Sequence, residues 1–286
     1  MSTASPTLPR VVHTIAELRE LLSGAGDVAL VPTMGALHEG HLALVRHAVE
    51  RATTVVVSVF VNPLQFAANE DLGRYPRTLE ADLEVLAPWP SLIVFAPDVD
   101  ELYPQAPIQT TVAAGPVASR FEGHSRSGHF NGVLTVVSKL LNIARPQWVV
   151  FGQKDAQQVF LVRQMVIDLN FPVLVDIVET VRDADGLALS SRNRFLDEKH
   201  RRAAIAIPNA LEAAASSADL GIDAVLGAAQ SVLMGESLVV LDYLAVVVPS
   251  TFVPVNDDYR GKALVLIAVE VGGIRLIDNE QIYLGA

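Results

Sequence analysis

The sequence predicts an α/β fold, a Rossmann-like parallel sheet with helices on both faces, followed by a smaller C-terminal α+β domain. Over the first 180 residues, short apolar runs alternate with helical patterns, which is typical of successive βαβ units. The runs are nearly continuous in Val, Ile and Phe, as expected of strands buried on both faces. Beyond Val181 the alternation gives way to a turn signal, alanine-rich stretches and further apolar runs, which indicates a second domain.

In the first domain, residues 1–180, each apolar run predicts a strand and each helical periodicity predicts a helix. The strands are expected at 28–31, 54–61, 91–96, 148–151 and 173–178. Helices are expected between them at 40–51, 79–86, 132–143 and 156–169, because apolar residues recur there at helical spacing. In open parallel sheets ligands bind at the carboxyl ends of the strands, so the polar segments that follow these runs form the predicted site.

The second domain, residues 181–286, begins with a hairpin signal. Asp183-Ala184-Asp185-Gly186 separates two short apolar runs and favours a tight turn. Helices are then predicted at 203–218 and 224–234, and strands at 238–248, 263–271 and 274–277. This order of elements predicts a small α+β unit.

Composition excludes several classes of protein. With 51% hydrophobic residues and a mean hydropathy of +0.37, the 286-residue chain has ample material for a core. No apolar run approaches the ~18 residues of a membrane span, and the start of the chain has no apolar export segment, so we expect a cytoplasmic protein. Cysteine is absent, which excludes disulfides, thiolate metal sites and cysteine nucleophiles.

Charge argues against nucleic acid as a partner. The formal net charge is −11, and binding a polyanion requires clustered Lys and Arg. The densest cationic group, Arg201-Arg202 beside Lys199, is interpreted as a solvated helix face. We therefore expect small-molecule partners, and any bound phosphate should be a small one.

The most informative segment is 32–41, Pro-Thr-Met-Gly-Ala-Leu-His-Glu-Gly-His. It leads from a predicted strand through Gly35 into a helix, and a helix start with free backbone N–H groups favours phosphate. His38 and His41 are three residues apart, so both rings can face the same way. Metal binding is the rival interpretation, but the His-Glu-x-x-His spacing typical of a zinc helix is absent.

Three further polar segments are candidates for the same chemistry. In Gly152-Gln153-Lys154-Asp155, Lys154 can neutralise a phosphate, or the segment is only a helix cap with an exposed lysine. In Leu189-Ser190-Ser191-Arg192, two hydroxyls and a guanidinium suit phosphate oxygens, and a helix-capping turn is the alternative. Asn62 either closes a turn before Pro63 or binds a ligand, and Gln65 suits a specificity contact in an apolar pocket.

Two loops, 69–78 and 121–130, are rich in glycine or ionisable groups. Each is either a mobile cover over a site or an exposed turn.

Taken together, the motifs resemble the pantoate–β-alanine ligase family, also called pantothenate synthetases. The resemblance covers nearly the whole chain and follows the family's order and spacing. Leu189 departs from it, since many members carry methionine there, which should alter adenine packing little. The matching stretches are 32–41, 60–66, 151–155 with Gln157-Gln158, and Ser190-Ser191-Arg192-Asn193.

The resemblance implies an ATP-dependent condensation of pantoate with β-alanine through pantoyl adenylate, releasing AMP and pyrophosphate. It also implies a homodimer and Mg²⁺ bound through the ATP phosphates, with no metal-ligating residues. ATP would be bound by the first domain and by residues of the second, the smaller domain that covers the active site. His41 would be the proton donor.

The family roles fall on matching positions of this chain. The residues expected to bind ATP are Met34, Gly35, Ala36, Leu37, His38, Glu39, Gly40, His41, Gly152, Gln153, Lys154, Asp155, Val181, Leu189, Ser190, Ser191 and Arg192. The residues expected to contribute to catalysis are His38, His41, Lys154, Ser190, Ser191 and Arg192, and those expected to bind pantoate are Gln65, Gln158 and Asn62.

Three other functions fit parts of the pattern. Another nucleotidyltransferase would transfer a nucleotide to a phosphate or an alcohol, but Gln65 and Gln158 suit a carboxylate substrate better. An aminoacyl-tRNA synthetase is disfavoured by the acidic charge and by the lack of a Lys-Met-Ser-Lys-Ser signature. A non-catalytic nucleotide-binding protein would be expected to have lost Lys154 or one of the histidines.

Overall fold

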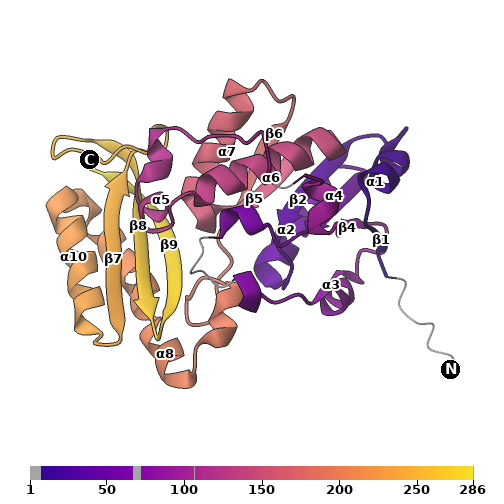
Figure 1. The fold of residues 1–286 in the computed structure, drawn as a ribbon. Helices are drawn as coiled ribbons and strands as arrows, with labels where there is room; N and C mark the ends of the chain where they lie inside the picture. Colours follow the sequence, from indigo (N-terminus) through magenta and orange to yellow (C-terminus); the bar gives the residue numbers. More distant parts are fainter. Residues whose placement is uncertain (1–7, 67–71, 106, 286) are drawn as a thin grey trace. The chain divides into compact units, whose positions relative to one another are not determined.

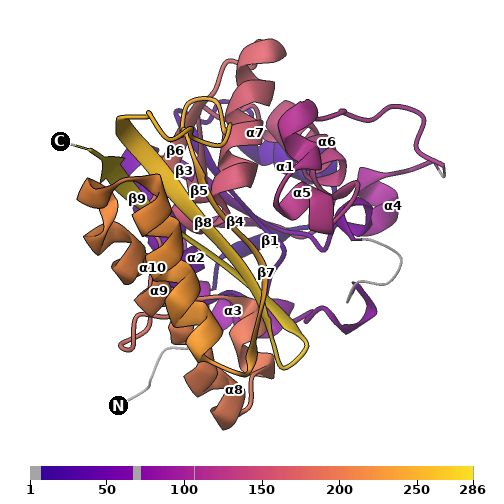
Figure 2. The same ribbon diagram turned by 90° about the vertical axis from the view of Figure 1, so that its left-hand side faces the viewer.

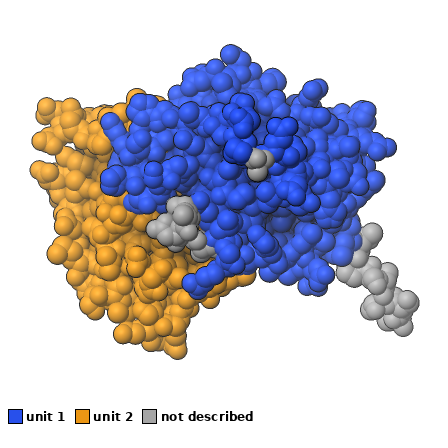
Figure 3. All heavy atoms as spheres, in the orientation of Figure 1, with its two compact units in different colours: residues 1–152, 161–178 blue, residues 153–160, 179–286 orange. Residues whose placement is uncertain are grey.

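The computed structural model describes residues 8–66, 72–105 and 107–285. The chain divides into two compact units, which Figure 3 colours separately. Unit 1 comprises residues 1–152 and 161–178, and unit 2 comprises residues 153–160 and 179–286. The division after residue 178 lies close to the expected boundary at 180. The segment 153–160 was assigned to the first domain but groups with unit 2.

Unit 1 is built on a six-stranded parallel sheet in the order β1-β4-β3-β2-β5-β6. The strands are β1 (Arg10–Val12), β2 (Val28–Thr33), β3 (Thr54–Val59), β4 (Ile93–Phe95), β5 (Trp148–Gly152) and β6 (Leu174–Val178). The five predicted strands are all present, each within two residues at either end. β1 was not predicted, because three residues are too few to show a periodicity.

Helices cover both faces of this sheet, as Figures 1 and 2 show. Helices α2 (Glu39–Arg51) and α3 (Leu79–Leu86) lie on one face, where Val45 and Leu86 share a buried cluster with Val31 of β2. Helices α1 (Ile15–Leu22), α6 (His129–Ala144) and α7 (Ala156–Asp168) lie on the other face. The two-sided burial explains the continuous apolar strands, and the Rossmann-like prediction is confirmed.

Unit 2 contains a three-stranded antiparallel sheet in the order β7-β8-β9. Its strands are β7 (Val239–Val247), β8 (Gly261–Val271) and β9 (Ile274–Leu284), and its helices are α8 (Glu198–Ala203), α9 (Ala206–Ser216) and α10 (Ile222–Gly235). Alanines such as Ala210, Ala214 and Ala229 are fully buried between α9, α10 and the sheet. Their small side chains let these layers approach closely, which confirms the predicted α+β unit.

Two predictions in this unit were wrong in detail. The helix expected at 203–218 is divided between α8 and α9. The last strand was expected to end at residue 277, where the sequence becomes polar, but β9 continues to Leu284. It does so because β9 pairs with β8 along its whole length, from Ile274 opposite Val271 to Leu284 opposite Gly261.

The remaining elements are short. Helices α4 (Val99–Leu102) and α5 (Glu122–Ser125) belong to unit 1. The 3-10 turns are Pro63–Gln65, Leu72–Arg74, Pro116–Ser119, Gln153–Asp155, Ser191–Phe195 and Ala218–Leu220. Within the described ranges no helix is both long and apolar enough to cross a membrane.

Candidate functional site

The turn between β2 and α2 uses its own amide hydrogens, contrary to the prediction of free N–H groups. Gly35 N–H donates to Thr33 Oγ1 at 3.1 Å, and the Ala36 and Leu37 N–H groups donate to the Asp82 carboxylate at 3.1 and 2.7 Å. The next amide hydrogens, at His38, Gly40, His41 and Leu42, also have acceptors within the segment. A phosphate here would therefore depend on side-chain donors and the helix dipole more than on these amides.

Asp82, on α3, holds this turn and was missed by the sequence reasoning. Its carboxylate is 3% exposed and accepts both turn amides. Gly35 has a φ of +79°, and a Cβ there would lie 3.0 Å from Asp82 Oδ2, so glycine is required on both counts. The signal was present, because Asp82 lies three residues after Leu79 and four before Leu86, on the apolar face of the predicted helix.

The two histidines are fixed by backbone hydrogen bonds. His38 caps α2, and its Nδ1 accepts from Gly40 N–H at 3.1 Å, while His41 Nδ1 accepts from His38 N–H at 3.4 Å. The ring centroids are 4.2 Å apart. Since Nδ1 is an acceptor in both rings, the neutral imidazoles carry their proton on Nε2. The arrangement provides two N–H donors from adjacent rings.

Asn62 and Gln65 form a connected amide pair in unit 1. Asn62 is 1% exposed, and its Nδ2 donates to Gln65 Oε1 and to Gly132 O, each at 3.1 Å. Its Oδ1 accepts from Leu64 N–H and from Tyr103 Oη, the latter at 2.9 Å. Because Asn62 donates to Gln65 Oε1, the Gln65 amide nitrogen is directed elsewhere, and it lies 2.8 Å from Met34 Sδ. Both readings of Asn62 thus have support, since it caps the turn at Pro63 and orients Gln65.

Two residues from the predicted loop 121–130 hold the backbone of Gln65. His129 Nδ1 lies 2.8 Å from Gln65 O, and Arg126 Nη2 donates to the same carbonyl at 3.4 Å. The segment is not a simple exposed turn, because it forms α5 and the start of α6 and buries Glu122 and Phe130. These contacts join it to the predicted pantoate residue of the same unit.

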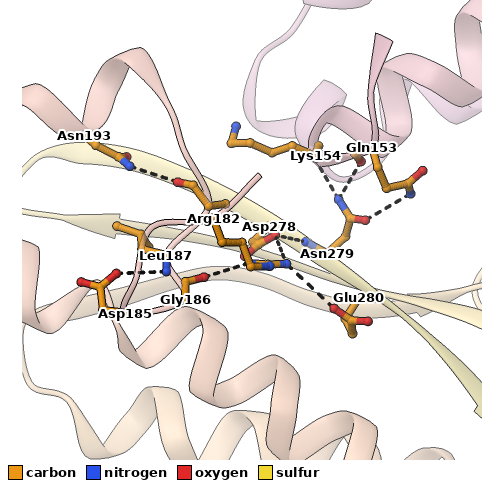
Figure 4. A network of polar contacts seen from close by, with 11 residues as sticks. Gln153, Lys154, Arg182, Asp185, Gly186, Leu187, Asn193, Asp278, Asn279 and Glu280 are labelled. Carbon is orange, nitrogen blue, oxygen red and sulfur yellow. Dashed lines mark hydrogen bonds and ion pairs between the residues drawn. The ribbon is translucent and has the colours of Figure 1, made fainter. Parts of the chain in front are cut away.

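In unit 2, residues 153–155 form a 3-10 turn that carries Lys154. The turn is held by Asn279 of β9, whose Nδ2 donates to Gln153 O at 3.0 Å and to Lys154 O at 2.9 Å. Asn279 Oδ1 accepts from Gln153 Nε2 at 3.2 Å. Figure 4 shows this amide between the two residues. Sequence reasoning missed Asn279 because it lies in a part of β9 that was predicted to be outside the strand.

The predicted hairpin is present and brings Val181 beside Leu189. Leu189 N–H donates to Val181 O at 2.9 Å, Arg182 pairs with Ala188, and Gly186 turns the chain with a φ of +86°. After it, Ser190 Oγ accepts from Arg192 N–H at 3.2 Å, which is the helix-capping role that was kept as an alternative. The cap uses Ser190 as an acceptor, so its hydroxyl hydrogen can still be donated to a ligand.

The interpretation of Arg201 as part of a solvated face was wrong. Arg201 Nη2 lies 2.7 Å from Asp183 Oδ2, and its Nη1 lies 2.7 Å from Asp185 Oδ2, so it fastens the hairpin turn to α8. The hydrogen bond from Arg201 lowers the pKa of Asp185. Arg202 does match the prediction, since it is largely exposed and pairs with Glu198 on its own helix.

Acid–base chemistry elsewhere in unit 2 centres on Asp278. Its side chain is 1% exposed, and its carboxylate makes a bidentate pair with Arg182 Nη1 and Nη2 at 2.5 and 3.1 Å. Burial raises the pKa of Asp278, while the Arg182 guanidinium opposes the rise. Figure 4 shows Arg182 between Asp278, Glu280 and the carbonyl of Gly186.

The predicted site residues are distributed over both units. Met34 to His41, Asn62, Gln65 and Gly152 belong to unit 1, whereas residues 153–155, Gln158, Val181 and Leu189 to Arg192 belong to unit 2. The loop predicted at 69–78 begins at residues 69–71, which lie outside the described residues. Among the residues that are described, no three His, Asp or Glu side chains gather into a possible metal site.

Comparison with known proteins gives one consistent family. The family model described as pantoate-beta-alanine ligase matches residues 10–281. The pantothenate synthetase of Leifsonia xyli subsp. xyli (strain CTCB07) is 54% identical over 284 residues, covering 94% of this chain and 99% of the relative. The pantothenate synthetase of Thermobifida fusca (strain YX) is 50% identical over 288 residues, covering 97% of each.

Solved structures agree with this result. The pantoate–β-alanine ligase from Thermus thermophilus has a TM-score of 0.92 and 46% identity, covering 96% of this chain and 99% of that one. The pantoate–β-alanine ligase from Francisella tularensis, complexed with beta-gamma ATP and β-alanine, has a TM-score of 0.79 and 31% identity, covering 95% of this chain and 97% of that one.

Proposed function

The chain belongs to the pantoate–β-alanine ligase family, and from that membership we propose that it condenses pantoate with β-alanine through pantoyl adenylate, releasing AMP and pyrophosphate. The observation that carries the proposal is the histidine pair at the start of α2. There, backbone N–H groups occupy both Nδ1 atoms and leave Nε2–H as the donor of each neutral ring. Fixed donors of this kind suit a phosphate on which charge builds during the reaction.

In the first half-reaction a pantoate carboxylate oxygen attacks the α-phosphorus of ATP. The new P–O bond forms as the bond to the bridging oxygen breaks, and pyrophosphate leaves with the electron pair. We assign the developing charge on the phosphates to His38, His41, Lys154, Ser190, Ser191 and Arg192. Lys154 and Arg192 supply positive charge, and the hydroxyls supply hydrogen bonds.

Pantoate is held by amides in this proposal. Gln65 and Gln158 bind its hydroxyl and carboxylate oxygens, and Gln65 also contacts β-alanine. The hydrogen bond from Asn62 Nδ2 to Gln65 Oε1 supports this role, because it fixes which end of the Gln65 amide is presented as the donor. Asn62 is therefore assigned an orienting role beside its predicted substrate-binding role.

In the second half-reaction the free amine of β-alanine attacks the acyl carbonyl of the adenylate. The C–N bond forms, the C–O bond to AMP breaks, and the amine loses a proton. No covalent enzyme intermediate is needed, so shielding the adenylate from water is the other requirement. We keep residues 69–78 and 121–130 as the proposed cover.

Mg²⁺ is proposed as the cofactor. Magnesium usually binds through substrate phosphates and water with few protein ligands, and the donor set of the described residues fits that mode because it is rich in N–H and O–H donors. When bound, the ion neutralises charge on the β- and γ-phosphates. Lys154 and the histidines then remain the chain's own contribution.

The test is AMP release with pantoate and β-alanine omitted in turn, together with exchange of labelled pyrophosphate into ATP. We expect AMP formation to need both substrates and the exchange to need pantoate alone. Lys154→Ala should lower the exchange rate by ~10²–10³, the typical effect of losing a donor at a charged transition state. Lys199→Ala, which removes an exposed lysine of α8, is the matched control. AMP formation by the unmodified chain that ignores pantoate would contradict the proposal.

Assembly and compartment are separate proposals. We propose a homodimer in the cytoplasm, on the basis of the family resemblance and the supply of ATP there. Light scattering coupled to gel filtration tests the first, and a mass of one chain of 30.7 kDa would contradict it.

A further inference from the structure

Two neighbouring residues of β9, Asp278 and Asn279, hold the two segments of unit 2 that carry predicted ATP-binding residues. Asp278 pairs with Arg182, which follows Val181 in the hairpin. Asn279 binds the turn of Lys154. Because successive side chains of a strand point to opposite faces, one strand can hold two different segments at once (Figure 4).

The Asn279 side chain uses its full amide. Both hydrogen bonds donated by Nδ2 go to consecutive backbone carbonyls, those of Gln153 and Lys154, at 3.0 and 2.9 Å. Oδ1 accepts from the Gln153 side chain at 3.2 Å. Asn279 is only 4% exposed, and its own backbone N–H donates to Asp278 Oδ1 at 2.8 Å. The amide orientation is thus determined, since exchanging O and N would set an acceptor against two carbonyl oxygens.

These bonds act on the backbone of Lys154 and not on its ammonium. In Figure 4 the Lys154 side chain extends away from the Asn279 amide. A three-residue 3-10 turn makes few hydrogen bonds of its own, so its position depends on outside partners. The Asn279 amide supplies them at the two residues from which the lysine projects.

We propose that Asn279 is a positioning residue for Lys154 in the adenylation step. It sets the place of the Lys154 backbone, and thereby the distance from the ammonium to the phosphates. The proposal rests on the proposed function, because it takes Lys154 as the phosphate-binding lysine. A misplacement of about 1 Å can cost on the order of 100-fold in rate, so a residue that never touches ATP can still govern the step.

The experiment is a double-mutant cycle in the full chain, measured by pantoate-dependent exchange of labelled pyrophosphate into ATP. Asn279→Ala alone should slow the exchange by about 10- to 100-fold. In a Lys154→Ala background the same substitution should cost less than about twofold more, because its effect passes through Lys154. Gln281→Ala, an exposed amide two residues along β9, is the matched control and should leave the rate unchanged.

A second variant guards against a folding defect. Asn279→Asp keeps the size and one acceptor oxygen but loses both donors, so it should be as slow as Asn279→Ala, with thermal unfolding monitored in parallel. If the losses from Asn279→Ala and Lys154→Ala multiply, or if Asn279→Asp retains the full rate, the inference is overturned. Exchange that is absent from the unmodified chain would instead contradict the proposed function, so the two failures are distinguishable.

Discussion

At the scale of single residues, the candidate site is stabilised mainly by buried polar side chains that were not part of the predicted set. Asp82 holds the turn before His38, Asn62 orients Gln65, and Asn279 holds Lys154. Tyr103 donates to Asn62 Oδ1, and burial raises the pKa of its hydroxyl, which therefore stays a donor. Each of these groups is buried with partners, as a low-dielectric interior requires.

Asp82→Asn tests this level. The substituted amide can accept only through its oxygen, so one of the two turn amides, Ala36 or Leu37, is left buried without an acceptor. We expect a loss of about 1–3 kcal/mol in the free energy of unfolding, together with a raised KM for ATP. Denaturant titration and steady-state kinetics measure the two effects. Glu84→Gln removes an exposed carboxylate from the same helix and should change neither.

At the scale of elements, helix α6 must approach the turn Pro63–Gln65 closely. An added Cβ on Gly132 would lie 2.1 Å from Leu64 O and 2.6 Å from Gln65 N, well inside contact distance. Gly132 also accepts a hydrogen bond from Asn62. The absence of a side chain at this one helical position therefore sets where the proposed pantoate residue Gln65 lies.

Gly132→Ala should displace that turn. We expect destabilisation of about 1–3 kcal/mol from overpacking, and a KM for pantoate that rises more than the KM for ATP. The control is Gly227→Ala in α10, where an added Cβ meets nothing within 4 Å. That change should stabilise the chain by up to about 1 kcal/mol, since alanine is the better helix former. Equal effects of the two substitutions on unfolding would refute the packing argument.

What the sequence could predict follows from how local each signal is. Strands and helices buried on regular faces, such as β2 and α2, show their periodicity directly. The start of α1 had a usable signal that was not applied, because Thr14 and Glu17 form a capping box. The residues that hold the site could not be found this way. Asn279 is an ordinary polar residue in sequence and becomes informative only when β9 pairs with β8.

At the scale of the whole molecule, the dependence of stability on pH should report the buried pair of Asp278 and Arg182. Burial raises the pKa of Asp278, and Arg182 opposes that rise. A carboxyl whose pKa is raised on folding contributes stability that is present below the unfolded value of about 3.9 and is lost as the pH rises through the folded value. Burial also raises the pKa of Glu280, which acts in the same direction.

Arg182→Met removes the opposing charge and leaves the Asp278 carboxylate buried and unpaired. At neutral pH we expect a loss of about 3–5 kcal/mol in the free energy of unfolding. The loss should shrink as the pH falls from 7.5 toward about 4.5, because the pKa of Asp278 rises further without Arg182 and the protonated acid needs no cation. Thermal unfolding across that range measures the trend. Arg202→Met, which removes a largely exposed ion pair with Glu198, should cost less than about 1 kcal/mol. An Arg182→Met penalty that stays constant or grows on acidification would show that the pair does not control the pH dependence.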